Sequence, residues 1–342
     1  MGRTVKALII GGAIAVLVAA GAAAAAALAW RDLNRPLAIA TAEWLLVPPG
    51  TPLARVSADL ASRGLIERPW LLTLYGRVTG DAVRIHAGEY ELLPGTTPRS
   101  LLGKLVAGQV FLHQLTIVEG SRFTDFFAAL RAHPAVAESG VAPEEVMSAL
   151  GAPDTSPEGQ FFPDTYRFPR GTRDIDLLRT AYEAMQRQLD AAWAERADEL
   201  AIATPYEALV LASIIEKETA LESERALISG VFHERLKRGM RLQTDPTVIY
   251  GLGDAFDGNL RRRDLEADTP YNTYTRAGLP PTPIALPGAA SLYAAVRPEW
   301  SGALFFVASG RGDGSHVFSA TLEEHNRAVR EFLRRTSGSA EP

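Results

Sequence analysis

The stretch "LASIIEKETA", residues 211–220, places two glutamates, Glu216 and Glu218, at the end of a run of apolar helix formers. On a helical wheel drawn for residues 208–222, Glu218 falls in the centre of the apolar face that contains Leu211, whereas Glu216 falls far from that centre. A carboxylate within an apolar face loses hydration, which disfavours its charged form and raises its pKa. The pattern therefore predicts a helix that holds Glu218 in surroundings of low polarity.

A glutamate in such surroundings is suited to proton transfer. A carboxylic acid that stays protonated near neutral pH can act as the general acid that cleaves a glycosidic bond. Periodicity alone leaves two other interpretations open. Most helical glutamates are solvated or paired with a nearby Arg or Lys, and Glu222 lies at nearly the same wheel angle as Glu218.

Composition narrows the functional classes. The chain has 342 residues, of which 47% are hydrophobic and 22% charged, which is typical of globular proteins and sufficient for two domains or more. A net charge of -5 argues against nucleic acid as a partner. The absence of cysteine excludes disulfides, thiolate metal sites and a cysteine nucleophile. The six histidines are scattered and no metalloprotease or nucleophile-elbow motif occurs, so the sequence predicts neither a metal site nor a cofactor.

The N-terminus predicts a membrane anchor. Residues 7–29 carry no charge and follow Arg3 and Lys6. At about 1.5 Å per residue this run spans a hydrocarbon core of roughly 30 Å. A cleaved signal peptide is the alternative, because Ala27–Ala29 resembles a cleavage site, but its apolar region is usually only about 7–15 residues long. We expect an uncleaved transmembrane helix, with everything after Trp30 exported.

Residues 31–115 are predicted to form a small α+β module. "EWLLVPPG" reads as a strand and turn, "TPLARVSADLASRGLI" as a helix, and "IHAGEYELLPG" as a second strand after another short helix. A third short helix follows in "TPRSLLGKLVAGQV". This order resembles that of LysM modules, which bind N-acetylglucosamine polymers, and a generic spacer domain fits it equally well.

Residues 116–342 are predicted to form a larger, mostly helical α+β domain. It closes with a hairpin in "ALFFVASGRGDGSHVFSA" and a C-terminal helix from Leu322. Two motif-like stretches carry little weight. "GLGDAFDG" follows no clear βα unit and its third glycine is out of place for a phosphate loop, and "GRGDGSH" is explained by a hairpin turn. The predicted fold class is thus α+β, with a cytoplasmic tail and transmembrane helix in residues 1–30.

One long segment carries a family resemblance. The run from "EKETA" to "LQTDPTVIYG" resembles the YceG-like family of membrane-anchored endolytic murein transglycosylases. "EGQFFPDTY" upstream, and "YNTYTRAGLPPTPIALPG" and "GSHVFSATLEEHN" downstream, extend the match. Order, spacing and anchor agree over essentially the whole chain. His233 in "VFHERL" departs from many relatives, but it lies outside the motifs.

The resemblance implies an activity. Members cut the β-1,4 bond between N-acetylmuramic acid and N-acetylglucosamine within nascent peptidoglycan strands, without water, leaving a 1,6-anhydromuramyl end that terminates the strand. The family's catalytic glutamate is the second of Glu-Lys-Glu-Thr, here Glu218. Most glycosidases need two carboxyl groups. Here the C6 hydroxyl of the substrate replaces water, so that Glu218 alone can serve as acid and then as base.

The resemblance also implies supporting residues and partners. Gln243, Asp245, Asn272 and Tyr274 are expected to bind substrate or to support the site, and Glu216 is expected to support Glu218. Asp245 also suits a turn or helix cap, and Tyr274 also suits the core. The implied partners are glycan strands, the membrane and peptidoglycan synthases. The implied location is the cytoplasmic (inner) membrane, crossed once, with the catalytic domain on the extracytoplasmic side.

The sequence also allows two alternatives to a transglycosylase. A wall-binding or division-scaffold protein would combine the anchor and module with an inactive C-terminal domain, and the intact Glu-Lys-Glu-Thr motif argues against it. A soluble lyase acting on a small metabolite would have no use for an export anchor.

Overall fold

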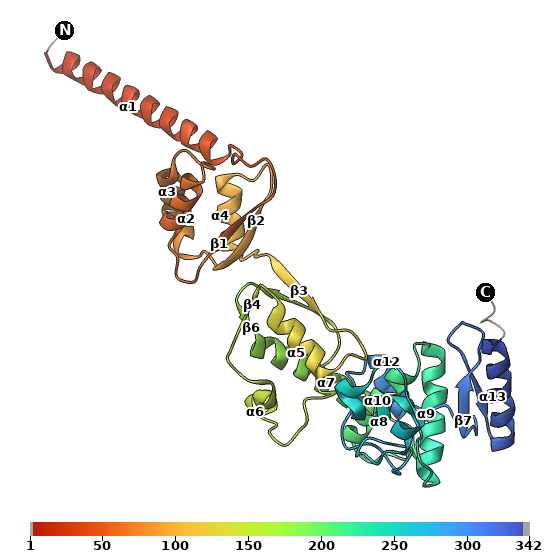
Figure 1. Cartoon of the computed structure of the whole chain (residues 1–342). Helices are drawn as coiled ribbons and strands as arrows, with labels where there is room; N and C mark the ends of the chain where they lie inside the picture. The colour runs from red at the N-terminus through yellow and green to blue at the C-terminus, as the bar shows by residue number, and fades with distance from the viewer. Residues whose placement is uncertain (1–2, 338–342) are drawn as a thin grey trace. The chain divides into compact units, whose positions relative to one another are not determined.

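The computed structural model describes residues 3–337 and is a mixed α+β structure. It contains two compact units (Figure 1). The first unit extends to His113 and also includes Phe168–Arg170. The second unit comprises Gln114–Arg167 and the chain from Gly171 onward, and most of its regular structure is helical.

The N-terminal helix, α1 (Arg3–Leu33), is continuous with the first unit (Figure 1). Its segment Leu8–Leu33 contains an 18-residue window with a mean hydropathy of 2.4 and is long and apolar enough to cross a membrane. The last turn of α1 packs against the unit, since Leu33 is buried in the core and Asp32 pairs with Arg68 at 2.7 Å. No linker residues therefore separate the apolar helix from the first unit.

The first unit has the order strand, two helices, strand, helix. Its strands β1 and β2 pair antiparallel, with Glu43 opposite Leu92. Leu45, Tyr90 and Leu101 are fully buried in the core between the strands and the helices. The elements are β1 (Glu43–Val47), α2 (Leu53–Ser62), α3 (Pro69–Thr79), the 3-10 turn Asp81–Val83, β2 (Gly88–Leu92) and α4 (Pro98–Val106).

The second unit begins with short strands around one helix. An aromatic cluster forms its core here, because Phe161 is fully buried and stacks on Phe123 at 5.2 Å between ring centroids. The loop "EGQFFPDTY" is thus part of the core. β3 (Leu112–Thr116) pairs with β5 (Thr165–Pro169), and β4 (Val136–Ala137) pairs parallel with β6 (Thr172–Arg173). The chain between β3 and β5 also forms α5 (Phe123–Ala132), the 3-10 turn Pro143–Glu145 and α6 (Val146–Ala149).

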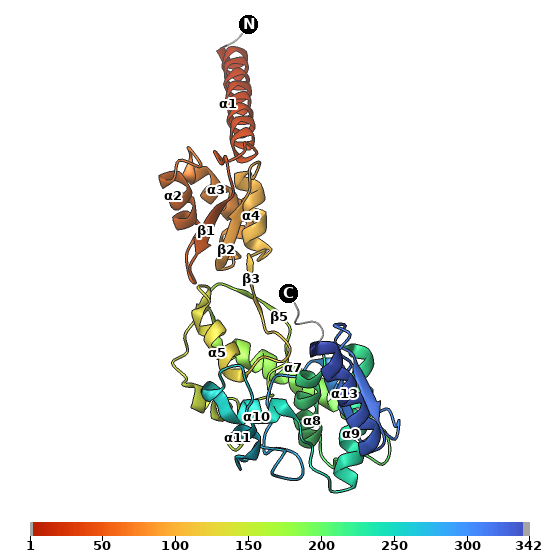
Figure 2. The same ribbon diagram turned by 45° about the vertical axis from the view of Figure 1, so that its right-hand side comes forward.

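Helix α8 (Pro205–Glu218) lies in the centre of the second unit (Figure 2). Every residue from Ala208 to Ile215 is buried, because neighbouring helices pack around it. The prediction of a single apolar face was therefore wrong, since a central helix is apolar on all sides. Those neighbours are α7 (Asp174–Ala194), α9 (Glu222–Lys237), α10 (Asp245–Leu252) and α12 (Ala289–Val296).

The chain leaves the helix after Glu218. Thr219 takes an extended conformation with φ -144° and ψ 138°, and α9 begins at Glu222. A single wheel through residue 222 was therefore wrong, and it misplaced Glu222. The side chain of Glu222 is exposed at the start of α9. It is no longer a competitor of Glu218 for the interior position.

The C-terminal segment consists of two strands and a helix. β7 (Phe305–Ala308) and β8 (His316–Ser319) pair antiparallel, with Phe306 opposite Phe318. α13 (Leu322–Ser337) packs along both strands (Figure 2). The 3-10 turn Gly253–Ala255 and α11 (Arg262–Glu266) lie in the preceding loop-rich region.

Candidate active site

Glu218 borders a cleft of about 570 Å³ in the second unit. The end of α8, the face of α9, the start of α10, the β7–β8 pair and α13 contribute its walls. The polar and charged groups that line it are Glu218, Arg235, Gln243, Asp245, Tyr274, His316, His325 and Asn326.

The position of Glu218 follows from how α8 begins and ends. The backbone N–H of Glu207 donates to the Thr204 hydroxyl at 3.2 Å, and the N–H of Thr204 donates to the Glu207 carboxylate at 3.2 Å. This capping box fixes the first turn. At the other end, the extended Thr219 leaves Glu218 as the last helical residue. A carboxylate there faces the negative end of the helix dipole, which disfavours its charged form.

Burial raises the pKa of Glu218 to about 7. Desolvation is the main cause, and the negative charge of Asp245 acts in the same direction. A hydrogen bond from Thr244 and electrostatic interactions with His316 and Arg235 oppose the shift. Glu218 is therefore substantially protonated at neutral pH, as a general acid must be.

Thr244 holds one oxygen of that carboxyl group. Its hydroxyl donates to Oε1 of Glu218. Thr244 is itself buried and fixed, because its N–H donates to the Thr273 hydroxyl at 3.1 Å and its carbonyl accepts from the Thr247 hydroxyl at 2.8 Å. With Oε1 acting as an acceptor, the proton of the neutral acid resides on Oε2, which is free to meet a substrate.

Gln243, which precedes Thr244, has a strained backbone. Its φ of 52° lies in the left-handed region, which non-glycine residues seldom adopt. The conformation is maintained because its N–H donates to the carbonyl of Thr273 at 3.1 Å. Strain of this kind concentrates at functional sites. The side chain of Gln243 is exposed at the cleft, within 3.5 Å of an Arg235 nitrogen.

Asp245 and Tyr274 form a pair on the same wall. The Tyr274 hydroxyl donates to Oδ1 of Asp245 at 2.5 Å. Burial, followed by this hydrogen bond, raises the pKa of Tyr274, so it remains a neutral donor. Asp245 is the first residue of α10, where the helix dipole favours a negative charge.

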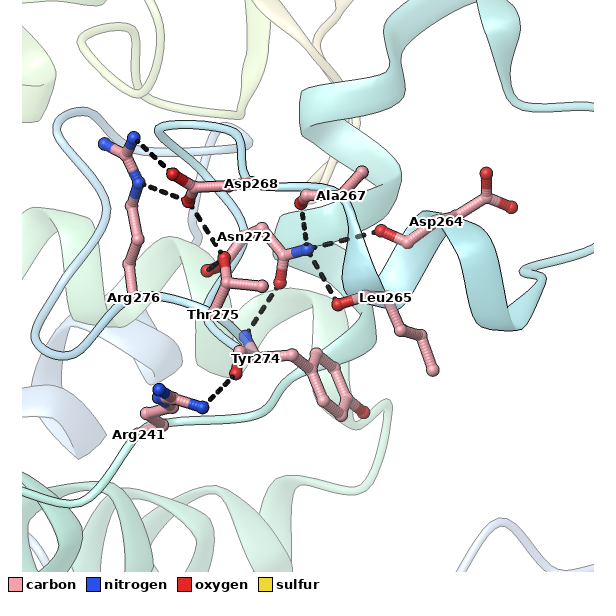
Figure 3. Close-up of polar contacts among 9 residues, drawn as sticks. All are labelled: Arg241, Asp264, Leu265, Ala267, Asp268, Asn272, Tyr274, Thr275 and Arg276. Carbon is pink, nitrogen blue, oxygen red and sulfur yellow. Dashed lines mark hydrogen bonds and ion pairs between the residues drawn. The ribbon is translucent and has the colours of Figure 1, made fainter.

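Asn272 does not line the cleft. It is buried, and its side-chain amide donates to the carbonyl oxygens of Asp264, Leu265 and Ala267 at 3.2, 3.0 and 2.6 Å (Figure 3). Its Oδ1 accepts from the backbone N–H of Tyr274 at 2.8 Å. Asn272 therefore supports the site by fixing the loop that presents Tyr274, and its amide is already fully engaged.

Glu216 faces a second hollow, of about 410 Å³. Its Oε2 accepts from the N–H of Gly288 at 3.0 Å, and its Oε1 lies 3.7 Å from Arg225. The side chain is only 6% exposed, which a wheel angle far from the apolar face did not predict. Glu218 borders both hollows, whereas Glu216 borders only this one.

Five polar groups in or beside the cleft are not among the residues predicted from the sequence, namely Thr244, Arg235, His316, His325 and Asn326. Thr244 and His316 lie inside stretches already matched to the family, but a lone hydroxyl or imidazole has no spacing that reveals its role. Arg235 resembles any helical arginine in the sequence. In the structure its guanidinium donates to the carbonyls of Leu304 and Leu242 at 2.6 and 2.8 Å.

The amino-acid sequence is similar to those of two proteins named endolytic murein transglycosylases. The chain is 32% identical over 313 residues to the endolytic murein transglycosylase of Bacillus subtilis (strain 168), covering 84% of each. It is 26% identical over 322 residues to the endolytic murein transglycosylase of Streptococcus pneumoniae serotype 2 (strain D39 / NCTC 7466), covering 84% of this chain and 58% of that protein.

A solved structure is also similar. The crystal structure of a yceG-like protein from Listeria monocytogenes matches with a TM-score of 0.52 and 31% identity, covering 84% of this chain and 98% of that one. The model of the YceG-like family matches residues 45–331, which cover most of both units and every residue described above around the cleft. With Glu218 at the end of a central helix and the family match extending over most of the sequence, this chain belongs to the YceG-like family.

Proposed function

We propose that this chain is an endolytic lytic transglycosylase of peptidoglycan. It cleaves the β-1,4 bond from N-acetylmuramic acid to N-acetylglucosamine within glycan strands and leaves 1,6-anhydromuramyl ends. The relatives named endolytic murein transglycosylases support the reaction class. The observation that carries the proposal is Glu218, an acid with a pKa of about 7 that borders an open cleft.

In the first half of the reaction, Glu218 acts as general acid. Oε2 delivers its proton to the glycosidic oxygen as the bond from that oxygen to C1 of the muramic acid breaks. Thr244 continues to donate to Oε1, so the new carboxylate keeps one hydrogen bond when its charge appears. The N-acetylglucosamine leaves with a free 4-hydroxyl group.

In the second half, the Glu218 carboxylate acts as general base. It takes the proton of the muramic acid C6 hydroxyl while that oxygen bonds to C1 and closes the anhydro ring. The proton lost in the first step is thus regained, and water is not consumed. Asp245 is the other carboxylate that lines the cleft, and it already accepts from Tyr274. One carboxyl group therefore suffices for both proton transfers.

The remaining residues divide into two roles in this proposal. Gln243 and the Asp245–Tyr274 pair bind the sugar units next to the scissile bond, because their polar groups line the cleft beside Glu218. Glu216 and Asn272 hold the surrounding backbone through Gly288 and Tyr274.

The first unit binds glycan in the manner of a LysM module, and its order of strand, two helices and strand supports this assignment. Helix α1 anchors the protein in the cytoplasmic membrane as a single span, with both units on the extracytoplasmic side. Nascent strands made by peptidoglycan synthases at that surface are the substrate, and cleavage terminates their growth.

Mass spectrometry of digested glycan strands tests the reaction. Purified full-length protein should convert uncross-linked strands into shorter strands that end in 1,6-anhydromuramyl units. Such ends are lighter by one water than the reducing ends that a hydrolase leaves. Products with ordinary reducing ends, or no change in strand length, would contradict the proposal.

A further inference from the structure

A carboxylate and a histidine in the second unit form a closely fixed pair beside the cleft. Nδ1 of His316 lies 2.7 Å from Oε2 of Glu224, and the backbone N–H of His316 donates to Oε1 of Glu224 at 2.8 Å. Both side chains are largely buried, with 14% and 11% exposed. One residue therefore occupies both oxygens of a buried carboxylate, which fixes the position and the orientation of the imidazole.

This pairing determines the tautomer of His316. A carboxylate accepts, so Nδ1 carries the hydrogen, and in the neutral form of the ring the lone pair is on Nε2. Within residues 3–337, the hydrogen bonds of His316 run through its backbone N–H and Nδ1, and none runs through Nε2. The ring contacts Phe306 edge to face at 5.5 Å, and the residue lines the cleft that Glu218 borders.

A second histidine, His325, also lines the cleft. Nδ1 of His325 is buried and has no hydrogen-bond partner in the described part of the chain. Its ring stacks on Phe305 at 5.2 Å. A buried polar atom without a partner is costly unless a ligand satisfies it. The Nε2 of His316 and the aromatic rings beside both histidines suit a ligand that is rich in hydroxyl groups and has apolar faces, as sugars are.

We propose that His316 contacts the substrate and that Glu224 positions it for that contact. Nε2 accepts a hydrogen bond from a hydroxyl group of the sugar unit bound beside Glu218. The identification of the ligand as a peptidoglycan sugar rests on the proposed function. The simpler alternative is that the pair only ties β8 to the start of α9.

Two substitutions of His316 separate these roles. His316→Asn retains a side-chain amide near the position of Nδ1 and can still donate to Glu224, but it has no atom at the position of Nε2. His316→Gln retains an amide near Nε2 and loses the bond to Glu224. We expect His316→Asn to lower kcat/KM about tenfold or more on uncross-linked strands, the usual effect of a lost hydrogen bond, with little change in unfolding temperature. His316→Gln should recover part of the activity and melt at a lower temperature.

A matched control is present in the first unit. His113 and Glu89 form a similar pair at 2.6 Å, and their substitution should not alter cleavage of soluble strands. His113→Asn is therefore expected to match the wild type. If His316→Asn also matches the wild type in kcat/KM, the pair is only structural and the proposal is wrong.

The positioning role of Glu224 requires a separate readout. Glu224→Gln can donate to Nδ1 as well as accept from it, so the tautomer is no longer fixed. Nitrogen-15 spectra of histidine-labelled protein should show the Nδ1–H form of His316 in the wild type and a mixture in Glu224→Gln. A single unchanged tautomer in the variant would overturn the positioning role.

A binding measurement that is independent of catalysis separates this inference from the proposed function. Uncross-linked glycan strands added to full-length Glu218→Gln protein should shift the Nε2 resonance of His316. A shift alongside a wild-type protein that releases no anhydromuramyl product would support the contact and refute the proposed reaction. An active wild-type protein without that shift would refute the contact alone.

Discussion

Glu218 must hold a proton in the resting protein and release it to the oxygen of the leaving sugar. Burial favours the protonated form, and the hydrogen bond from Thr244 favours the carboxylate. Replacement by glutamine keeps size and shape but removes the transferable proton. General acid–base catalysis contributes roughly 10²–10⁴-fold. Because one group serves both halves of the proposed reaction, we expect Glu218→Gln to lose anhydromuramyl release at or beyond the upper end of that range. Circular dichroism should show an unchanged fold.

Glu216→Gln is the matched comparison two residues away. Its carboxylate accepts from Gly288 and lies near Arg225 in the second hollow, so a neutral amide weakens local packing and leaves Glu218 in place. We expect a lower unfolding temperature and a much smaller loss of product release. An inactive Glu216→Gln beside an active Glu218→Gln would show that the two roles are reversed.

The raised pKa of Glu218 also predicts how activity and stability depend on pH. As general acid it must be protonated, so activity should fall as pH rises through about 7. Its pKa is raised from 4.5, so the folded protein binds this proton more tightly than the unfolded chain does. The associated stability is complete below about pH 4.5 and is lost as pH rises through about 7.

Glu218→Gln does not titrate, so thermal unfolding of the two proteins at two pH values checks this effect. The variant should be more stable than the wild type at pH 8, by roughly 1–3 kcal/mol, and the difference should shrink near pH 4. If the wild type and Glu218→Gln are equally stable at both pH values, the pKa of the buried Glu218 carboxyl group is not raised.

At the scale of elements, the loop after α11 depends on Asn272. Asn272→Asp preserves shape but directs a carboxylate at three carbonyl oxygens, where the amide now donates. We expect a loss of more than about 2 kcal/mol in the free energy of unfolding, because one oxygen of the buried carboxylate faces these carbonyls without a donor and the other keeps only the N–H of Tyr274. Asn259→Asp, an exposed position in the same region, is the control and should be near neutral. Chemical denaturation of both variants measures the difference.

The elements also show what periodicity can and cannot predict. The apolar run of α8, the strand and helix order of the first unit and the start of α13 at Leu322 are local patterns, and the sequence contains them in full. The end of α8 at Glu218 is not marked by such a pattern, because no Gly or Pro follows Glu218 directly and Thr219 nevertheless takes an extended conformation. The helical wheel placed Glu218 on a single apolar face, but α8 is a central helix and has no such face. The wheel also treated residues 208–222 as one helix, although the chain leaves the helix between Glu218 and Glu222.

The candidate site was predictable to a similar degree. Gln243, Asp245 and Tyr274 line the cleft with Glu218 as the resemblance implied, whereas Asn272 supports it from behind. Thr244 and His316 reach the site from positions 26 and 98 residues after Glu218, and only tertiary packing brings them there.

For the whole molecule, we predict that the first unit contributes binding and the second unit chemistry. A chain that begins at residue 111 retains β3, which pairs with β5 in the structure. It should cleave soluble strands and bind intact sacculi more weakly than the full-length protein. Sedimentation with sacculi measures binding, and unchanged binding would contradict a glycan-binding role for the first unit.

Helix α1 is joined directly to the first unit. Helix α1 runs unbroken from the apolar segment to Leu33, and its last turn is held to the first unit by three contacts. Arg99 lies 4.5 Å above the ring of Trp30, Asp32 pairs with Arg68, and Leu33 is buried. An apolar span of 26 residues that is joined to its unit in this way suits a permanent anchor better than a removable signal. We therefore expect the mature protein to keep residues 7–29 and to resist extraction from membranes by alkaline carbonate. The intact mass of the protein purified from membranes measures this directly, and a mature chain that begins at Trp30 would identify the segment as a signal peptide.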